Sequence, residues 1–197
     1  DEEVEETEEG EEDATESVVA PTQEVVETPK SEAVFKMSGY PRYLEGARYW
    51  LHWAGFPESV YSPYGGNDDY KDDYTSRALW VNYLAGGSRV LPDKPGLNVP
   101  IDLAFALHSD AGKRADDSIV GTLGIYYTDN GASYKDGTPR TNSRVLTDMV
   151  MRQITMDIRR SVEPQWKRRS MWDKSYVEAR VPEVPTTLIE LLSHQNF

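Results

Sequence analysis

Two short apolar segments of the sequence each carry an ionisable residue of a kind that takes part in catalysis. IDLAFALHSD (101–110) contains the imidazole of His108, and TTLIELLSHQN (186–196) contains the carboxylate of Glu190. A carboxylate within an apolar strand is costly unless it is paired, protonated or bound to a metal, so its pKa is expected to be raised. A glutamate with a raised pKa suits general base catalysis near neutral pH. His108 and Glu190 are therefore the first candidates for a site.

Structural roles for both residues remain the alternative interpretation. A lone histidine at the end of a strand is more often a hydrogen-bonded structural residue than a ligand. Glu190 can equally be a helix cap or a salt-bridge partner, for which the chain offers Arg168, Arg169 and Arg180. The sequence contains no HExxH, GxSxG, GxGxxG or P-loop motif, so a serine triad has no support.

The elements that must position these residues follow from apolar periodicity and turn residues. The runs 101–108 and 186–192 are short and almost continuously apolar, which is typical of parallel strands covered on both faces. Strands that alternate with helices indicate an α/β fold with three layers, a mostly parallel sheet flanked by helices. Sites in such sheets gather at the carboxyl ends of strands. The predicted strands are 59–62, 101–108, 119–128 and 186–192, and the predicted helices are about 42–54, 73–85 and 143–162.

Charge is unevenly distributed along the chain. Residues 1–34 contain 14 of the 34 acidic residues and one basic residue, Lys30, so the remainder holds 20 acidic and 20 basic residues. Residues 1–36 are therefore predicted to be a disordered acidic linker. Binding of a basic partner or calcium by this acidic tail is the functional alternative. The remainder is formally neutral and lacks the basic stripe that nucleic-acid binding needs.

Composition also limits the kind of metal site and the membrane topology. The chain has no cysteine, so disulfides and thiolate sites are excluded, and any metal must be held by His, Asp or Glu. No apolar run approaches the roughly 20 residues of a membrane span. The start, DEEVEETEEGEED, contains no signal peptide, and we interpret it as an internal cut in a longer polypeptide.

Several segments resemble the second half of the zinc-dependent N-acetylmuramoyl-L-alanine amidase family. Within it the likeness is greatest to a branch in Bacteroidetes that is often labelled xanthan lyase and carries a golvesin-type binding module. The similarity covers about residues 38 to 197. The segments that carry it are FALHSDAG (105–112), SIVGTLGIYYT (118–128), RRSMWDKSY (168–176) and VPTTLIELLSHQN (184–196), with ARYWLHWAGFPESVYS (47–62) and LWVNYLAGG (79–87) closest to the branch.

The resemblance implies a fold, a metal and residue roles. The family has a mostly parallel sheet flanked by helices, and it holds zinc by His, Glu and His beside a catalytic glutamate. By this likeness His108 is a zinc ligand and Glu190 the catalytic glutamate. Asp110 stands where the family usually has Asn, and Ser170 follows Arg169 where it often has Gly. The expected substrate contacts are Asp110, Arg169 and Asn196, together with His194, which follows Glu190 closely.

The rest of the zinc site is expected outside this chain. The family's first His and its Glu ligand lie near the start of the domain, and no glycine-flanked histidine precedes His108. His52 lies in a predicted helix and is favoured as a packed or capping residue. Residues 37–197 are therefore expected to form the C-terminal part of a discontinuous catalytic domain, with upstream segments of the parent chain as its partner. Asp102 or Asp110 is expected to orient the His108 imidazole.

Three functions follow as hypotheses. The leading one is zinc-dependent hydrolysis of an amide, with a cell-wall peptide as substrate and an extracytoplasmic location implied by the resemblance; a zinc carboxypeptidase is a close variant. A polysaccharide lyase would need a base and a carboxylate-neutralising group, for which Tyr126, Tyr127 and Arg140 are candidates. A non-catalytic glycan-binding module would use stacking platforms among five tryptophans and twelve tyrosines. Trp50 and Trp53 fall in a predicted helix, where core packing is the simpler interpretation.

Overall fold

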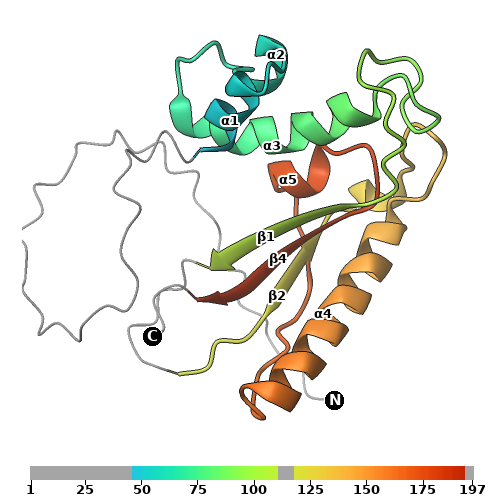
Figure 1. Cartoon of the computed structure of the whole chain (residues 1–197). Coiled ribbons are helices and arrows are strands. Elements are labelled where there is room, and N and C mark those ends of the chain that lie inside the picture. Colours follow the sequence, from blue (N-terminus) through green and yellow to red (C-terminus); the bar gives the residue numbers. More distant parts are fainter. Residues whose placement is uncertain (1–45, 111–117, 194–197) are drawn as a thin grey trace, which may run out of the picture. The chain divides into compact units, whose positions relative to one another are not determined.

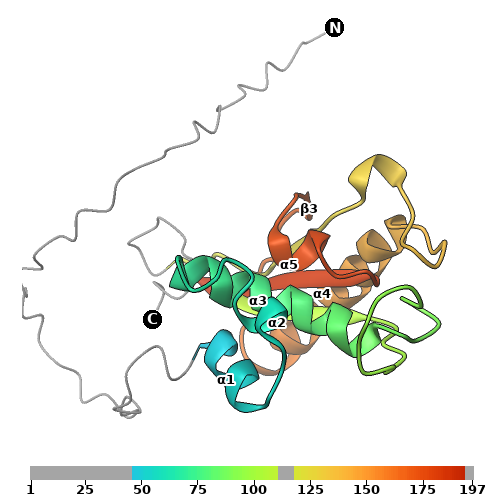
Figure 2. The same ribbon diagram turned by 90° about the horizontal axis from the view of Figure 1, so that it is seen from above.

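The computed structural model describes residues 46–110 and 118–193. The chain divides into two units, Asp1–Gly39 and Tyr40–Phe197. The first unit, with the predicted linker 1–36, lies outside the described residues, and so do His194 and Asn196. The described part of the second unit is an α/β structure, a mixed sheet with helices on both faces (Figures 1 and 2).

Four strands form the sheet, in the order β1-β4-β2-β3. β1 runs parallel to β4 and β2 runs parallel to β3, while the central pairing of β2 with β4 is antiparallel. The sheet is therefore mixed. The alternation of strands with helices predicted a mostly parallel sheet, but β2 runs antiparallel to β4. The strands are β1 (Ala104–Asp110), β2 (Leu123–Tyr126), β3 (Trp172–Asp173) and β4 (Thr186–Ser193).

Helices cover the two faces of the sheet unequally. Helix α4 packs against β2 and β4 on one face. On the other face α5 contacts β2 and β4, and α3 and α1 lie beyond it (Figure 1). The helices are α1 (Ala47–Trp53), α2 (Glu58–Tyr61), α3 (Asp69–Ala85), α4 (Thr141–Ser161) and α5 (Val177–Arg180), with a 3-10 turn, η2, at Asp129–Gly131.

Most predicted helices are confirmed, with shifted ends. The helix predicted at about 73–85 begins at Asp69, because the side chain of Asp68 caps it by accepting from the backbone N–H of Lys71 at 2.9 Å. Of the helix predicted at about 42–54, the described residues form α1. The strand predicted at 59–62 is wrong, since these residues fall largely within helix α2. Four residues are too few for apolar periodicity to separate a strand from a helix.

Buried side chains lie on both faces of the sheet. Leu123, Ile125 and Leu188 are fully buried and pack together on the face that α5 covers, because side chains alternate along β2 and the Gly124 position faces α4. A Cβ atom on Gly124 would lie 2.3 Å from the sulfur of Met151, so glycine is what lets α4 approach β2. The most buried positions of α4 are Ser143, Thr147, Met151 and Thr155. The apolar side chains that repeat every four residues in the sequence of this helix are only half-buried, because the other four positions occupy the line of closest approach; they are Leu146, Val150, Ile154 and Ile158.

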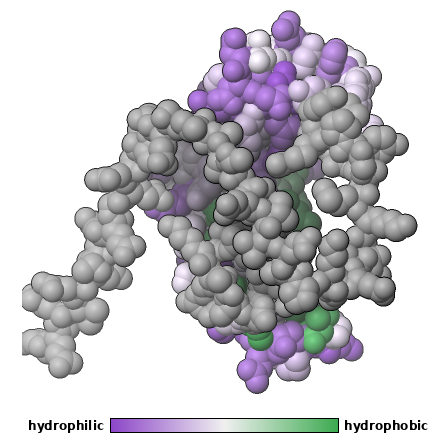
Figure 3. Space-filling view, turned by 90° about the vertical axis from the view of Figure 1, so that its left-hand side faces the viewer, coloured by the Kyte–Doolittle hydropathy of each residue, from purple (hydrophilic) through white to green (hydrophobic). Residues whose placement is uncertain are grey.

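Strand β1 differs from its prediction. Burial alternates along it, and Phe105 and Leu107 are 53% and 59% exposed. The prediction that both faces of this strand are covered is therefore wrong for the described residues, in which β1 pairs only with β4. In Figure 3, which looks onto the face at the carboxyl ends of β1 and β4, apolar surface is visible beside the grey atoms, below the hydrophilic surface of the helical layer.

A buried carboxylate organises the region from α1 to α3. The side chain of Asp72, fully buried in α3, accepts from the backbone N–H groups of Tyr64 at 2.7 Å and Gly66 at 2.9 Å. The guanidinium of Arg48 from α1 lies 3.5 Å from the same carboxylate. Asp72 thereby holds the loop after α2 and the start of α1 against α3, because a buried carboxylate is stable only when it is hydrogen-bonded and paired.

Candidate functional site

His108 and Glu190 lie side by side on neighbouring strands. They are partners in the parallel register of β1 and β4, so their side chains point to the same face of the sheet. The register shifts directly after this pair, where Asp110 lies opposite Ser193, which marks a β-bulge. Bulges re-aim side chains and are frequent beside active sites. The structure thus brings the two residues together near the carboxyl ends of their strands, while their chemical roles stay predictions.

The carboxylate of Glu190 is poorly satisfied. Its Oε2 atom is buried and has no hydrogen-bond partner among the described residues. Burial raises the pKa of Glu190, although the positive charges of His108 and Arg169 act against this rise. Of the arginines offered for a salt bridge, Arg168 pairs instead with Asp148, at 2.6 Å. Within the described part of the chain Glu190 forms no ion pair, so the structural interpretation of this residue gains no support.

His108 is held by a carboxylate that sequence reasoning did not identify. Its Nε2 atom lies 2.9 Å from Oε2 of Glu178, on the short helix α5. This hydrogen bond raises the pKa of His108 above its ordinary 6.5, and burial works against the rise. The expected acceptors are engaged elsewhere, since Asp102 pairs with Arg89 at an exposed position and Asp110 pairs with Arg169. A four-residue helix leaves almost no periodic signal, so the pattern could not place Glu178 beside His108.

Asp110 and Arg169 form the neighbouring pair of the site. Nη1 of Arg169 donates to Oδ2 of Asp110 at 2.5 Å, and the guanidinium lies 5.7 Å from the ring centroid of Trp172. The backbone N–H of Arg169 also bonds to the carbonyl of Thr122 at 2.9 Å, which fixes its place beside the sheet. Two of the four predicted substrate-contact residues are therefore paired with each other, and their charges influence the pKa of Glu190 in opposite directions. The other two, His194 and Asn196, lie outside the described residues.

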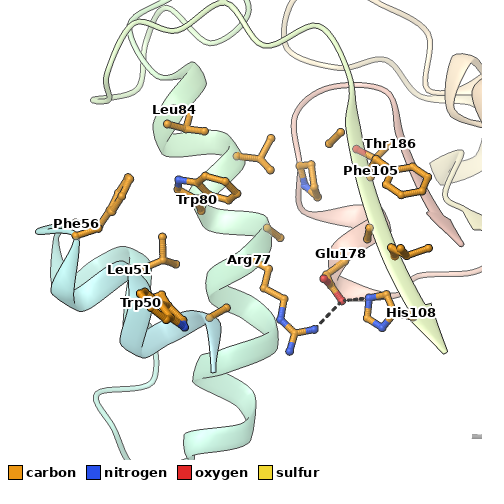
Figure 4. Close-up of a pocket in the computed structure, with 18 residues that line it drawn as sticks. Trp50, Leu51, Phe56, Arg77, Trp80, Leu84, Phe105, His108, Glu178 and Thr186 are labelled. Carbon is orange, nitrogen blue, oxygen red and sulfur yellow. Dashed lines mark ion pairs between the residues drawn. The ribbon is translucent and has the colours of Figure 1, made fainter. Parts of the chain in front are cut away.

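A pocket of about 780 Å³ opens beside His108, between helices α1 and α3 and strand β1. Figure 4 shows Arg77, Glu178 and His108 in sequence at one end of it, joined by two ion pairs. The apolar walls include Leu51 and Trp80. Pockets that bind small molecules are commonly about 300–1,000 Å³ in volume, mostly apolar, with a few polar groups. The arrangement therefore has room for a ligand next to the histidine.

A zinc ion needs three protein ligands or more, typically imidazole and carboxylate groups when thiolates are lacking. In residues 46–110 and 118–193, no group of three His, Asp or Glu side chains is close enough to hold a metal. His108 and the carboxylates around it have the right donor chemistry for part of such a set. His52 does not complete it, because its ring stacks on Tyr61 with centroids 4.7 Å apart.

The residues considered for the other two functions have local contacts. Tyr126 is buried, and the hydroxyl of Tyr127 donates to Asp129 at 2.9 Å. Arg140 lies over the ring of Tyr134 and donates to a backbone carbonyl. All three lyase candidates are therefore buried in the fold or engaged in contacts within it.

The two tryptophans of α1 are not packed in the core. Trp50 and Trp53 are 61% and 54% exposed, and their rings meet edge to face with centroids 5.3 Å apart. The interpretation of this aromatic pair as core packing is therefore wrong. Helix α1 has seven residues and buries only Leu51 fully, so most of its apolar side chains stay at the surface.

Comparison of the chain with family models, with characterised proteins and with solved structures gave no significant match. Among the helices of residues 46–110 and 118–193, none has the length and apolar character needed to cross a membrane.

Proposed function

We propose that this chain carries part of the active site of a metal-dependent hydrolase that cleaves an amide bond. The observation that carries the proposal is the pairing of a half-buried glutamate with a histidine across β1 and β4, with one glutamate oxygen left without a hydrogen-bond partner in the described part. A buried acceptor without a partner costs about 1–3 kcal/mol of stability, and such groups in native proteins often have a catalytic or ligand-binding role.

Glu190 is the proton carrier in this proposal. Its raised pKa brings it closer to neutral pH, where a general base is most effective. It accepts a proton from the attacking water and returns it to the leaving amine. Arg169 and Asp110 lie beside it as polar contacts for the substrate.

His108 supplies one metal ligand in this proposal. When bound, a zinc ion polarises the scissile carbonyl and lowers the pKa of the water that attacks it. Because the described residues gather no three-ligand set, we propose that the remaining ligands come from residues outside 46–110 and 118–193, including upstream segments of a longer parent chain. The resemblance to zinc amidases supports zinc as the metal, a cell-wall peptide as the substrate and an extracytoplasmic location.

Metal content tests the ligand role. The 197-residue chain and its His108→Ala variant are dialysed and analysed for zinc, and so is the longer polypeptide wherever this sequence is a part of one. Near-equimolar zinc that is lost in the variant supports the proposal. A longer polypeptide that binds zinc equally well with and without His108 overturns it.

Hydrolysis of peptidoglycan fragments tests the role of Glu190. Removal of a general base lowers the rate by about 10²–10⁴-fold, so Glu190→Gln should lose activity while zinc content stays unchanged. The matched control is Glu183→Gln, since Glu183 faces Arg140 and not His108.

Glycan binding is the second candidate, and one observation favours it. The exposed pair Trp50 and Trp53 offers apolar ring surface of the kind on which sugar rings stack. Replacement of both by Ala should then abolish retention on insoluble glycan, and Glu190→Gln should leave it intact. The opposite pattern, activity lost with Glu190 and retention unchanged without the tryptophans, favours the hydrolase alone.

A further inference from the structure

Glu178 reaches His108 from a different layer of the fold. It lies on α5, whereas His108 lies on β1, and 70 positions separate them in the chain. The Nε2–Oε2 distance is 2.9 Å, and the side chains of His108 and Glu178 are 26% and 13% exposed. An N–H to carboxylate hydrogen bond at this distance is charge-assisted and of normal strength.

Glu178 is itself held in place. Nη1 of Arg77, on α3, lies 3.6 Å from the same Oε2 atom (Figure 4). Asp73, one helical turn earlier, accepts from Arg77 at 2.5 Å and from the backbone N–H of Arg48 at 3.1 Å. A series of contacts therefore runs from Asp73 through Arg77 and Glu178 to His108, and it connects α3 and α5 to β1. The contact of Asp73 with Arg48 connects α1 to the same series.

The contact decides which nitrogen of the imidazole carries the proton. A neutral imidazole has one N–H, and the carboxylate of Glu178 can only accept a hydrogen bond. The proton is therefore held on Nε2, and Nδ1 keeps its lone pair. Metal-binding histidines are commonly oriented in this way by a carboxylate on the second nitrogen.

We propose that Glu178 is a positioning residue that holds His108 as the Nε2–H tautomer and reserves Nδ1 for a metal ion, with Arg77 and Asp73 as its support. The metal part of this inference rests on the proposed function, whereas the tautomer part does not. The sequence offered Asp110, or less favourably Asp102, for the orienting role, and both are paired with arginines instead.

A purely structural ion pair would behave differently. Partly exposed ion pairs contribute little to stability, typically about 0–1 kcal/mol. Loss of Glu178 should therefore leave the midpoint of thermal unfolding almost unchanged while it alters the imidazole of His108. A large fall in stability with an unaltered imidazole would mean that the pair only joins α5 to β1.

The first measurement is the tautomer of His108 in the full chain. Long-range proton–nitrogen correlation spectra of isotope-labelled protein distinguish Nδ1–H from Nε2–H, and His108→Gln assigns the signal among the three histidines. The spectra are taken at about pH 9, well above the ordinary histidine pKa of about 6.5. We expect a single Nε2–H tautomer in the parent chain and a mixture of both tautomers in Glu178→Ala.

Two further variants keep the result clear. Glu178→Gln retains the size of the side chain, and because its amide can also donate, it should admit both tautomers as well. Glu183→Ala removes a carboxylate that pairs with Arg140 at 3.7 Å, and it should leave His108 unchanged. The same single tautomer in all variants, or a mixture in the parent chain, overturns the positioning role.

The second measurement is zinc affinity, by competition with a chelator. Loss of an orienting carboxylate typically lowers metal affinity by about 10–100-fold, so Glu178→Ala should bind zinc that much more weakly than Glu183→Ala. Equal zinc affinity in the two variants overturns the metal part of the inference. The competition is run on the longer polypeptide as well, wherever this sequence is a part of one. Absence of zinc binding there too removes the proposed function and the metal role together, and the tautomer result still decides whether Glu178 positions His108.

Discussion

The carboxylate of Glu190 lies in an environment that does not favour its charged form. Its Oε2 atom is buried without a hydrogen-bond partner in the described part, and Asp110 and Glu178 add negative charge nearby. Burial is the larger effect, and it raises the pKa of the carboxyl group. His108, across the strand, also has a raised pKa, for which the main cause is the hydrogen bond to Glu178.

These two shifts give the stability of the fold a definite pH dependence. A group whose pKa is higher in the folded chain than in the unfolded chain binds its proton more tightly when folded. Its contribution is therefore complete below the unfolded pKa, which is 4.5 for Glu190 and 6.5 for His108, and is lost as pH rises through the folded pKa. Both groups should therefore lower the free energy of unfolding as the pH rises from mildly acidic to alkaline values.

We predict that Glu190→Gln removes the part of this dependence that belongs to Glu190. The variant should match the stability of the parent chain at about pH 4 and have a larger free energy of unfolding than the parent chain at about pH 8. Urea unfolding across this range measures the difference. A stability difference that stays constant with pH would show that Glu190 does not titrate between these limits in the folded chain.

At the scale of elements, Gly124 sets the distance between α4 and the sheet. A Cβ atom there would lie 2.3 Å from Sδ of Met151 and 2.5 Å from Cγ2 of Thr147. Overpacking of this kind costs typically about 1–3 kcal/mol, so Gly124→Ala should lower the free energy of unfolding by at least that amount. Met151→Ala in the same chain should recover part of the loss, as denaturant titration of the single and double variants will show. Strict additivity of the two substitutions would contradict the close approach.

How much of the fold the sequence predicts depends on element length. The long α4 and the apolar β4 are confirmed, because seven or more residues carry a clear period or an almost continuous apolar run. Helix α2 and the two-residue β3 depend on tertiary contacts and give no such signal. The direction of β2 also could not be read, since strand patterns state burial and not orientation.

Part of the candidate site could also be predicted, because two of its residues lie in almost continuously apolar segments. His108 and Glu190 stand out because each interrupts an apolar run, and the parallel pairing of their strands brings them together. Glu178 and Arg77 lie among other charged residues, where nothing in the pattern marks them. Their importance comes from the packing of α5 against α3 and the sheet, a tertiary arrangement.

At the scale of the whole molecule, charge is concentrated in a small part of the sequence. The net charge of the 197 residues is −13, while residues 37–197 have 20 acidic and 19 basic residues, since Lys30 and Lys36 both precede them. Removal of residues 1–36 should therefore move the isoelectric point from about 4.7 to nearly neutral. Because proteins near zero net charge associate more readily, the shortened chain should also be least soluble near neutral pH.

Isoelectric focusing and the solubility of both forms in low salt measure this change. A shortened chain that still focuses near the original isoelectric point would show that titrating groups of the folded part, and not the acidic segment, determine the charge of the protein.

The guanidinium of Arg169, which pairs with Asp110 next to Glu190, also lies 5.7 Å from the ring centroid of Trp172. Indole fluorescence responds to a charge held near the ring, and this ring is 40% exposed. A ligand that draws Arg169 or Asp110 away will therefore change the emission of Trp172. The difference between the parent chain and Trp172→Phe separates this signal from the other tryptophans, so occupancy of the site can be followed with no added dye.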